Sequence, residues 1–216
     1  MRAAVLADPG AFHADAARKL PWFVRDIGSH GAWLRFEDGQ WRGWDAVTAA
    51  AIDPGLPTDF TPWTTAFDAS DAPFFKWFSG GRTNGCFAEV DVHVLTGHGD
   101  EAALIFEGDR WDMAADNGRG APVDTYKVSR RKLLLETAKC AIALDGLGLK
   151  AGDRIALNMP SIPAQLFWTE AAKRRGIIYT PVFGGFSDKT LSDRIDDAGA
   201  RVVTTADGGY RNAQVF

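Results

Sequence analysis

The sequence has few residues of the kinds that build disulfide frameworks and metal sites. Cysteine occurs twice in 216 residues, at Cys86 and Cys140, and histidine occurs four times. Two distant thiols are too few for a disulfide scaffold or a zinc knuckle, and the histidines show neither an H-x-x-x-H pair nor a mixed spacing with cysteine. We therefore expect two unbridged thiols and no metal site.

Long hydrophobic runs and an excess of basic charge are also lacking. The apolar run at residues 3–7 stops at Asp8-Pro9, which makes it too short for a signal peptide or a membrane anchor. A net charge of −4 gives no basic surface for nucleic acid or for an anionic membrane. With 46% hydrophobic and 24% charged residues, the composition is that of a globular protein, which we expect to be cytoplasmic.

No common catalytic signature is present. The sequence contains no G-x-S-x-G and no Walker segment, and we assign no catalytic residue within this chain. Residues 97–102 and 146–151 both fit a loose G-x-G-x-x-A, but a dinucleotide fingerprint must follow a strand and open a helix. The first segment precedes a predicted strand, and the second follows a predicted helix, so we interpret the second as a helix stop.

The first part of the chain, residues 1–71, is unusually rich in tryptophan. Six of the eight tryptophans lie in the first 77 residues: Trp22, Trp33, Trp41, Trp44, Trp63 and Trp77. Apolar spacing predicts a helix over residues 11–23, and residues 46–52 are compatible with one short helix. The rest of this arm is rich in glycine, proline and aspartate, and we expect it to be ordered, because its aromatic surface must be buried. The rest of the protein and a partner chain both remain open as the covering surface.

From residue 102 the sequence alternates between strand and helix patterns. Strands are predicted at 102–107, 154–158, 177–183 and 201–205, and helices at 130–147, 163–175 and 188–198. Ser129 is placed to cap the first of these helices, and Pro163 fits the first turn of the second. Short connections between such elements predict right-handed βαβ units and a parallel sheet. The predicted fold class is α/β, with residues 72–216 as the second domain.

Two of the predicted strands end in glycine pairs, Gly184-Gly185 and Gly208-Gly209, and Arg211 follows the second pair. Ligands of open α/β sheets bind at the carboxyl ends of the strands, where glycine loops and arginine suit an anion. From the residues alone, Arg211 is either a phosphate contact or an exposed loop arginine. The basic run at residues 130–132 is expected to be a solvated helix face.

Several segments, taken in order, resemble one family. They are residues 75–78 (FKWF), 80–84 (GGRTN), 99–108 (GDEAALIFEG), 152–160 (GDRIALNMP), 182–187 (VFGGFS) and 203–211 (VTTADGGYR). Asp91 and His93 fit a D-R-H pattern in which Val92 replaces the arginine. Residues 72–214 thereby resemble the acetyl/propionyl-CoA synthetase branch of the adenylate-forming enzymes.

The resemblance implies that this chain is the first part of the large domain of an acyl-CoA synthetase. Such an enzyme joins a short carboxylate to ATP with Mg²⁺, giving an acyl-adenylate, and then transfers the acyl group to coenzyme A. Gly185 and Arg211 match the family's coenzyme A-binding positions, whereas Gln214 replaces a second basic residue. The phosphate loop, the metal-binding segment and the mobile lid of the family would lie beyond Phe216, so the fragment is not expected to be catalytic alone.

The tryptophan-rich arm further resembles the start of trifunctional propionyl-CoA synthases. In that family a ligase acting on 3-hydroxypropionate is fused to a dehydratase and an NADPH-dependent reductase. The expected partners are the remainder of the chain's own polypeptide and a second copy in a homodimer. The alternative hypothesis is a non-catalytic docking or assembly module that uses the arm as its contact surface.

Overall fold

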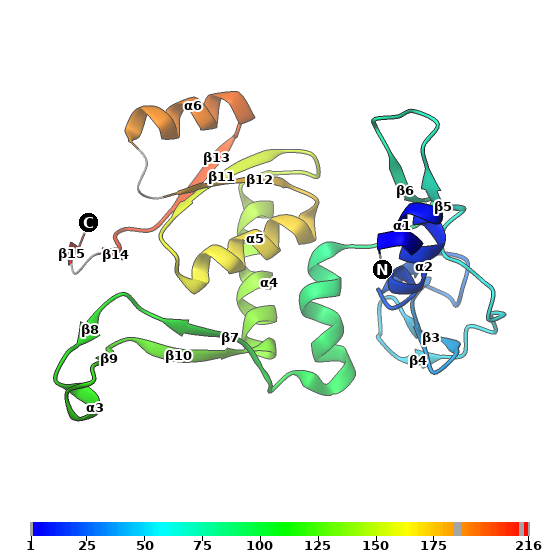
Figure 1. Cartoon of the computed structure of the whole chain (residues 1–216), viewed down its shortest axis with the longest axis horizontal. Coiled ribbons are helices and arrows are strands. Elements are labelled where there is room, and N and C mark those ends of the chain that lie inside the picture. Colours follow the sequence, from blue (N-terminus) through cyan, green and yellow to red (C-terminus); the bar gives the residue numbers. More distant parts are fainter. Residues whose placement is uncertain (1, 184–186, 212–213, 216) are drawn as a thin grey trace. The chain divides into compact units, whose positions relative to one another are not determined.

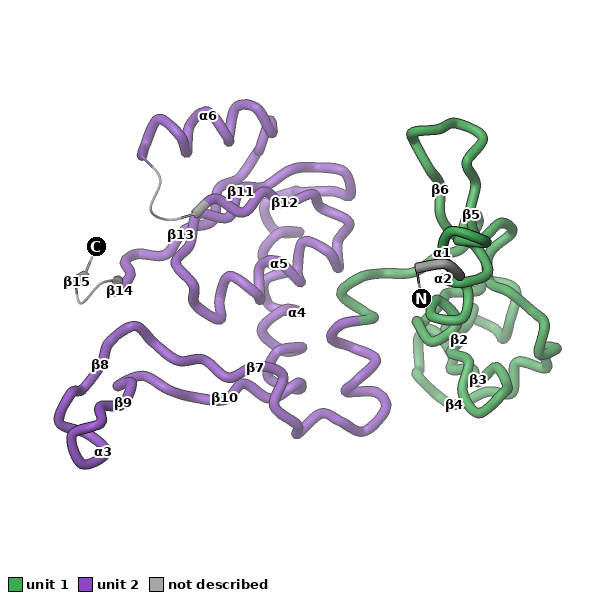
Figure 2. The backbone as a smooth tube through the Cα atoms, viewed as in Figure 1, with its two compact units in different colours: residues 1–88 green, residues 89–216 purple. Residues whose placement is uncertain are grey.

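The computed structural model describes residues 2–183, 187–211 and 214–215. The chain forms two compact units, residues 1–88 and residues 89–216 (Figures 1 and 2). The composition and the start of the resemblance predict a division between residues 71 and 72 instead. The compact units differ from that division because β6 (Lys76–Ser79) and the loop after it pair and pack with the residues before them. The domain boundary at residue 72 stays a prediction.

The first unit contains two helices, a four-stranded antiparallel sheet and a separate hairpin. The helices are α1 (Arg2–Ala7) and α2 (Pro9–Arg18). The sheet has the order β1-β2-β3-β4, from β1 (Trp22–Val24), β2 (Ala32–Glu37), β3 (Gln40–Asp45) and β4 (Ala51–Ile52). The hairpin pairs β5 (Thr65–Asp68) with β6 (Lys76–Ser79).

Helix α2 is shorter than the predicted helix over residues 11–23. It begins at Pro9, where the Asp8 carboxylate accepts a hydrogen bond from the Ala11 amide at 2.9 Å, and it ends at Arg18. Pro21 disfavours helical backbone in the residue before it. The Trp22 indole donates to the Ala17 carbonyl at 2.7 Å and is buried, so residues 22–24 extend as a strand. The prediction of helix up to residue 23 is wrong for this reason.

The predicted short helix over residues 46–52 is a turn followed by β4. The Asp45 carboxylate accepts hydrogen bonds from the Thr48 amide at 2.8 Å and the Val47 amide at 3.0 Å. These bonds lower the pKa of Asp45, the one from Thr48 most strongly. A side chain that satisfies two successive amides offers the backbone an alternative to a helix, and the chain returns as a strand paired with β3.

The tryptophans of the arm pack against other residues of the same unit. Four of them are at most 6% exposed: Trp22, Trp33, Trp41 and Trp63. Trp33 stacks on Trp44, its register partner across β2 and β3, with ring centroids 4.1 Å apart. The prediction of an ordered arm is therefore confirmed, and most of its aromatic surface is buried internally. Trp77, at 41% exposed, is the exception among the six.

The second unit is built around one parallel sheet and one antiparallel ribbon. Its elements are η1 (Phe87–Asp91, which crosses the boundary between the units), η2 (Val94–His98), β7 (Ala102–Glu107), β8 (Trp111–Asp112), α3 (Ala115–Gly118), β9 (Ala121–Pro122), β10 (Thr125–Ser129), α4 (Arg130–Gly146), β11 (Arg154–Met159), α5 (Pro163–Arg175), β12 (Ile178–Phe183), α6 (Asp188–Ala198), β13 (Val202–Thr205), β14 (Tyr210–Arg211) and β15 (Gln214–Val215). The elements η1 and η2 are π-helical turns.

The parallel sheet confirms the α/β prediction. Its strand order is β12-β11-β13, with β11 in the centre. Helices α4 and α5 lie on one face and α6 on the other (Figure 1). The core on the first face joins Ile155 and Leu157 of β11 to α4 and α5, whereas Ala156 points to the second face and is also fully buried. A strand buried on both faces explains the continuous apolar run of its sequence.

Strand β7 does not join the parallel sheet. It pairs antiparallel with β10, and β8 and β9 pair as a further two-stranded segment of the same ribbon. The prediction of a single alternating sheet from residue 102 is wrong here, because the connection between β7 and β10 carries no helix long enough for a crossover. Parallel pairing needs such a crossover, and antiparallel pairing does not.

Candidate functional site

The candidate site is the carboxyl edge of the parallel sheet, between β11 and β13. The chain leaves β11 towards β12 on one side and reaches β13 on the other, so the winding direction reverses at β11. In chain order β11 comes first, with β12 on one side of it and β13 on the other. This arrangement places a topological switch point between β11 and β13. Ligands of doubly wound sheets bind in the crevice outside that point.

Two polar side chains meet at this point. The last register pair between β11 and β13 is Asn158 with Thr205. Both side chains lie on the face that α6 covers, because residues alternate along a strand and Leu157 belongs to the core on the other face. Asn158 is half-buried and Thr205 is exposed. Sequence reasoning missed this pair, although a polar residue at the end of an apolar strand, just before Met159-Pro160, was a visible signal.

The structure places the predicted site residues only in part. Gly185 lies outside the described residues. Arg211 belongs to β14, where its register partner is Gln214 in β15. Ser187 begins the described chain again as the N-cap of α6, with its hydroxyl accepting from the Thr190 amide at 3.4 Å. The coenzyme A assignments to Gly185 and Arg211 stay predictions.

An apolar groove of about 420 Å³ lies on the opposite face of the sheet, beside α5. Residues 104–106 of β7, the first turns of α5, and Tyr179 and Pro181 of β12 line it. Its polar side chains are few and include Ser161 and Gln165. Small-molecule sites are typically concave and largely apolar, with a few polar groups.

Residues 152–156 (GDRIA) stabilise the amino edge of the sheet. Asp153 accepts hydrogen bonds from the Lys150 amide at 2.7 Å and from Arg201 at 2.7 Å. Hydrogen bonding from the Lys150 amide is the largest cause that lowers the pKa of Asp153. Arg154 donates to the Ala198 carbonyl at 3.0 Å at the end of α6. These contacts stabilise the fold at the amino edge, and they lie far from the carboxyl edge.

Asp91 and its neighbours form ion pairs with α5. Asp91 pairs with Arg174, and Lys173 donates to Glu89 at 2.7 Å and to Glu170 at 2.8 Å. Glu170 is 2% exposed, and burial is the largest cause that raises its pKa. Asp91 thus has a structural role, which is to fix η1 against α5 together with Glu89.

The GGRTN segment packs against β1 within the first unit. The Arg82 carbonyl accepts from the Phe23 amide at 2.8 Å, and the Thr83 hydroxyl donates to the Pro21 carbonyl at 2.8 Å. A Cβ atom on Gly81 would lie 2.5 Å from the Trp22 ring. Glycine at this position lets the backbone pass directly under a buried tryptophan.

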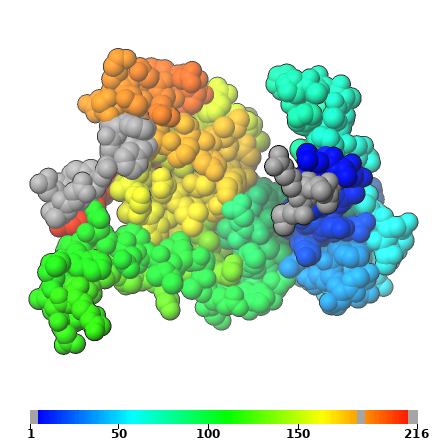
Figure 3. Space-filling model, viewed as in Figure 1, coloured from blue at the N-terminus to red at the C-terminus, as the bar shows by residue number. Residues whose placement is uncertain are grey.

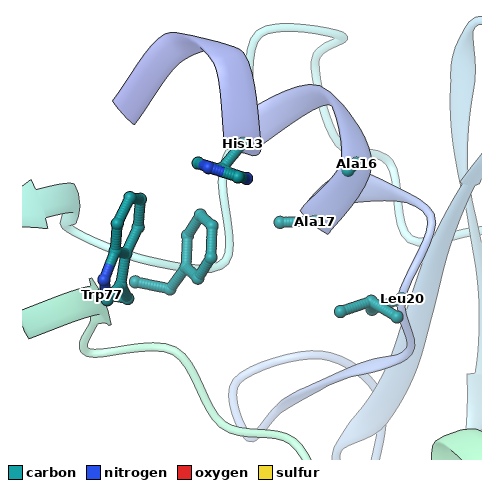
Figure 4. Close-up of a pocket in the computed structure, with 6 residues that line it drawn as sticks. His13, Ala16, Ala17, Leu20 and Trp77 are labelled. Atoms are coloured by element: carbon teal, nitrogen blue, oxygen red, sulfur yellow. The ribbon is translucent and has the colours of Figure 1, made fainter. Parts of the chain in front are cut away.

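A second hollow, of about 340 Å³, lies in the first unit between α2 and β6 (Figure 4). His13 meets Trp77 edge to face, with ring centroids 5.0 Å apart, and Leu20 lies at the far side. Near it, the β5–β6 hairpin projects from this unit, in teal in Figure 3, and its tip exposes Phe74 and Phe75 by 74% and 52%.

The remaining sequence predictions concern charge and metal chemistry. The basic run is largely solvated and pairs with nearby acids: Arg131 with Asp100 at 3.4 Å and Lys132 with Glu136 at 2.6 Å. Neither thiol is in a disulfide, and burial raises the pKa of Cys140 to about 11. Within the described ranges, no three His, Cys, Asp or Glu side chains gather as a metal site. None of the described helices is both long and apolar enough to cross a membrane.

Comparison with known proteins identifies the family. The AMP-binding enzyme profile matches residues 94–215, which is more than half of the chain. The chain belongs to the AMP-binding enzymes. A second profile, the acetyl-coenzyme A synthetase N-terminus, matches residues 58–88 and ends where the first compact unit ends. Together with the relatives below, it places the chain in the acetyl/propionyl-CoA synthetase branch of this family and confirms the resemblance.

Its relatives include proteins named acetyl-coenzyme A synthetase from several bacteria. The relative from Mycolicibacterium smegmatis is 43% identical over 155 residues, or 71% of this chain. Those from Campylobacter jejuni and Streptomyces avermitilis are 42% and 40% identical over 73% and 70% of the chain. The match covers 15%, 22% and 21% of these three relatives, so the chain spans less than a quarter of their length.

Proposed function

We propose that this AMP-binding enzyme is the N-terminal portion of an AMP-forming acyl-CoA synthetase for a short carboxylate. In the first step a carboxylate oxygen attacks the α-phosphorus of ATP, and pyrophosphate leaves. In the second step the thiol of coenzyme A gives up its proton and its sulfur attacks the acyl carbon, and AMP leaves with the electron pair of the broken acyl–phosphate bond. The proposal is carried by two matches in order: residues 58–88 match the acetyl-coenzyme A synthetase N-terminus profile, and residues 94–215 match the general AMP-binding enzyme profile.

Acetate, propionate and 3-hydroxypropionate are the proposed substrates. ATP and coenzyme A are the proposed co-substrates, and Mg²⁺ enters bound to ATP. The described residues offer no cluster that fits a resident metal ion, so we assign no step to a metal held by this part of the enzyme. The proposed cytoplasmic location and a homodimer stay predictions.

Gly185 and Arg211 are proposed to bind coenzyme A. Their place in the chain supports this assignment, since they follow β12 and β13 at the carboxyl edge where ligands of such sheets bind. An arginine fork suits a phosphate, and a charge-assisted hydrogen bond contributes about 1.5–3 kcal/mol. Gln214 lacks that charge, so binding at this site depends more heavily on Arg211.

The tryptophan-rich arm supports a more specific proposal about which kind of acyl-CoA synthetase this is. Residues before 58 lie outside both matched profiles, yet they fold as an ordered sheet with buried tryptophans. We propose that the arm marks a trifunctional propionyl-CoA synthase, whose further domains are a dehydratase and an NADPH-dependent reductase. NADPH would bind to the reductase and not to the segments at residues 97–102 and 146–151.

ATP–pyrophosphate exchange tests the ligase proposal. The full-length gene product is assayed with acetate, propionate and 3-hydroxypropionate in the absence of coenzyme A. Exchange that depends on one of these acids is the expected result, and the acid with the highest kcat/KM identifies the substrate. An enzyme that exchanges with none of them would contradict the proposal.

One observation favours a second candidate, a non-catalytic docking module. The β5–β6 hairpin exposes Phe74 and Phe75 at its tip and part of Trp77 on β6, and large exposed apolar patches mark interaction sites. The gene downstream of codon 216 separates the two candidates. A stop codon there favours docking, whereas a Ser/Thr- and Gly-rich loop ending in Pro-Lys-Gly supports the ligase.

A further inference from the structure

We propose that an apolar surface of the first unit is the docking site for ligase residues encoded after codon 216 of the same polypeptide. The surface has two parts. One is the aromatic face of the β5–β6 hairpin, formed by Phe67, Phe75 and Trp77, and the other is the hollow between α2 and β6. The inference rests on the proposed function, which makes this chain the N-terminal portion of a longer enzyme, and it adds an internal contact to it.

The three rings of the aromatic face form one continuous row. Phe67 and Trp77 are register partners across the hairpin, with ring centroids 4.5 Å apart, and the rings of Phe67 and Phe75 are 5.6 Å apart. The next register pair, Asp68 with Lys76, points to the opposite face, because side chains alternate along a strand. The hairpin is therefore amphipathic, with one aromatic and one charged face.

The described part of the chain covers this aromatic face only in part. Phe75 and Trp77 remain exposed, and so does Phe74 beside them at the tip. Among the described strands, β5 and β6 form a two-stranded sheet of their own. A hairpin of two strands is marginally stable in water unless its apolar face packs against another element. The exposed rings therefore indicate a further element that packs on them.

The row of rings continues into the hollow. The His13 ring of α2 meets Trp77 edge to face, and Leu20 lies at the far side (Figure 4). His13 is the only titratable side chain among the six residues that line the hollow, whose volume is about 340 Å³. A cavity of about 150 Å³ already holds a benzene ring, so the hollow has room for one or two large apolar side chains. An unpaired charge would be disfavoured there.

The matched profiles indicate which chain covers the surface. Residues 58–88, which contain the whole hairpin, match the acetyl-coenzyme A synthetase N-terminus profile, whereas residues before 58 lie outside both matched profiles. Three tryptophans of that earlier part are buried inside the unit: Trp22, Trp33 and Trp41. The exposed row of rings thus belongs to the part that this chain shares with the acetyl-coenzyme A synthetases.

The length of the relatives provides the covering element. The match covers 15%, 22% and 21% of three of them, so more than three quarters of each lies outside it. Under the proposed function, the corresponding residues of this enzyme follow residue 216. A surface in the shared part is then covered by a segment that is shared as well. Tethering on one polypeptide also gives that segment a high effective concentration at the surface.

Thiol labelling of the full-length gene product tests whether the surface is covered. Phe75→Cys places a thiol on the aromatic face, and Leu20→Cys places one at the hollow. Val47→Cys is the matched control, because Val47 is exposed in the turn after β3 and lies outside both profiles. Each variant reacts with a maleimide in buffer and in urea, peptide mass spectrometry follows the rate at the new thiol, and thermal melting verifies folding.

We expect the thiols of Phe75→Cys and Leu20→Cys to react at least about tenfold more slowly in the folded enzyme than in urea, because a docked surface reacts only when it opens. The thiol of Val47→Cys should react within about threefold of its rate in urea. Equal rates in buffer and urea for both surface variants would overturn the inference.

Photocrosslinking identifies what covers the surface. Benzoylphenylalanine in place of Phe75 keeps an aromatic ring on the face and reacts on irradiation with C–H groups that contact it. We expect a product of monomer mass in denaturing electrophoresis, joined to a peptide after residue 216, and no such peptide when Val47 carries the probe. A product of dimer mass would assign the surface to a second copy and overturn the inference. So would crosslinking that reaches no residue after 216.

ATP–pyrophosphate exchange by the same protein separates this inference from the proposed function. If no acid supports exchange but the crosslink to residues after 216 forms, the ligase proposal fails and the docking site stands. If exchange depends on one of the acids while both surface thiols react at their rates in urea, the ligase proposal stands and the docking site fails.

Discussion

Glu170 is a carboxyl group placed where water hardly reaches it. It is 2% exposed, and one of its oxygens accepts from Lys173 at 2.8 Å while the other has no hydrogen-bond partner in the described part of the chain. Lys173 is shared with Glu89 at 2.7 Å. The charge pattern of residues 163–175 gives no sign of this burial, because a glutamate beside a basic helix end is ordinarily solvated.

The raised pKa of Glu170 predicts a pH dependence of stability. Desolvation is the largest cause of the shift, so the folded state favours the protonated acid above the ordinary value of 4.5. The stabilisation is complete below the unfolded pKa and is lost as the pH rises from there through the folded pKa. In urea denaturation across this window, Glu170→Gln should therefore gain free energy of unfolding relative to the wild type as the pH rises, and then level off.

Glu136 provides the control with the opposite sign. Hydrogen bonds from Lys132 and Lys139, the first being the larger cause, lower its pKa. Its contribution is present above the unfolded pKa and is lost as the pH falls through the folded pKa. Glu136→Gln should therefore lose free energy of unfolding relative to the wild type as the pH rises. Parallel curves for the two variants would contradict the assignment of the shifts.

At the scale of the elements, the second unit follows its local sequence signals closely. Ser129 and Ser187 cap α4 and α6 as N-cap residues, Pro163 opens α5, and Gly176 ends α5 in the left-handed conformation with φ of 68°. Each signal acts within one helical turn and needs no knowledge of the tertiary contacts, and the sequence predicted two of them, Ser129 and Pro163. The antiparallel sheet of the first unit escaped prediction, although Asp38-Gly39 is a typical hairpin turn between β2 and β3.

The Asp38-Gly39 turn yields a prediction about that hairpin. Both residues have positive φ, 52° and 79°, and no atom lies within 4 Å of a Cβ placed on Gly39. Gly39→Ala should therefore cost about 1–2 kcal/mol through backbone strain alone. Gly146→Ala is the matched control, since its surroundings are equally open and its φ is not positive; as the last residue of α4 it should be neutral or stabilising by up to about 1 kcal/mol, because alanine favours a helix. Equal melting temperatures of the two variants would argue against a strained turn.

At the scale of the whole molecule, the proposed ligase needs more than the part described here. The matched part covers about a fifth of the relatives' length, and the described residues contain no metal-binding cluster. We predict that the isolated 216-residue chain gives no acid-dependent ATP–pyrophosphate exchange, while the full-length gene product does. The two proteins are compared at equal concentration with the same three acids. Exchange by the isolated chain above the rate without enzyme would contradict this prediction.

The sequence by itself determined the family and the local elements of the second unit. Caps, helical periodicity and apolar runs act over a few residues, and six ordered segments were enough to indicate the acetyl/propionyl-CoA synthetase branch. The tertiary structure alone decided which strands pair. It separated β7 from the parallel sheet, set the order β12-β11-β13, buried Glu170 and joined Asn158 to Thr205. Pairing brings together residues 47 positions apart, and its free energy comes from contacts that no local pattern encodes.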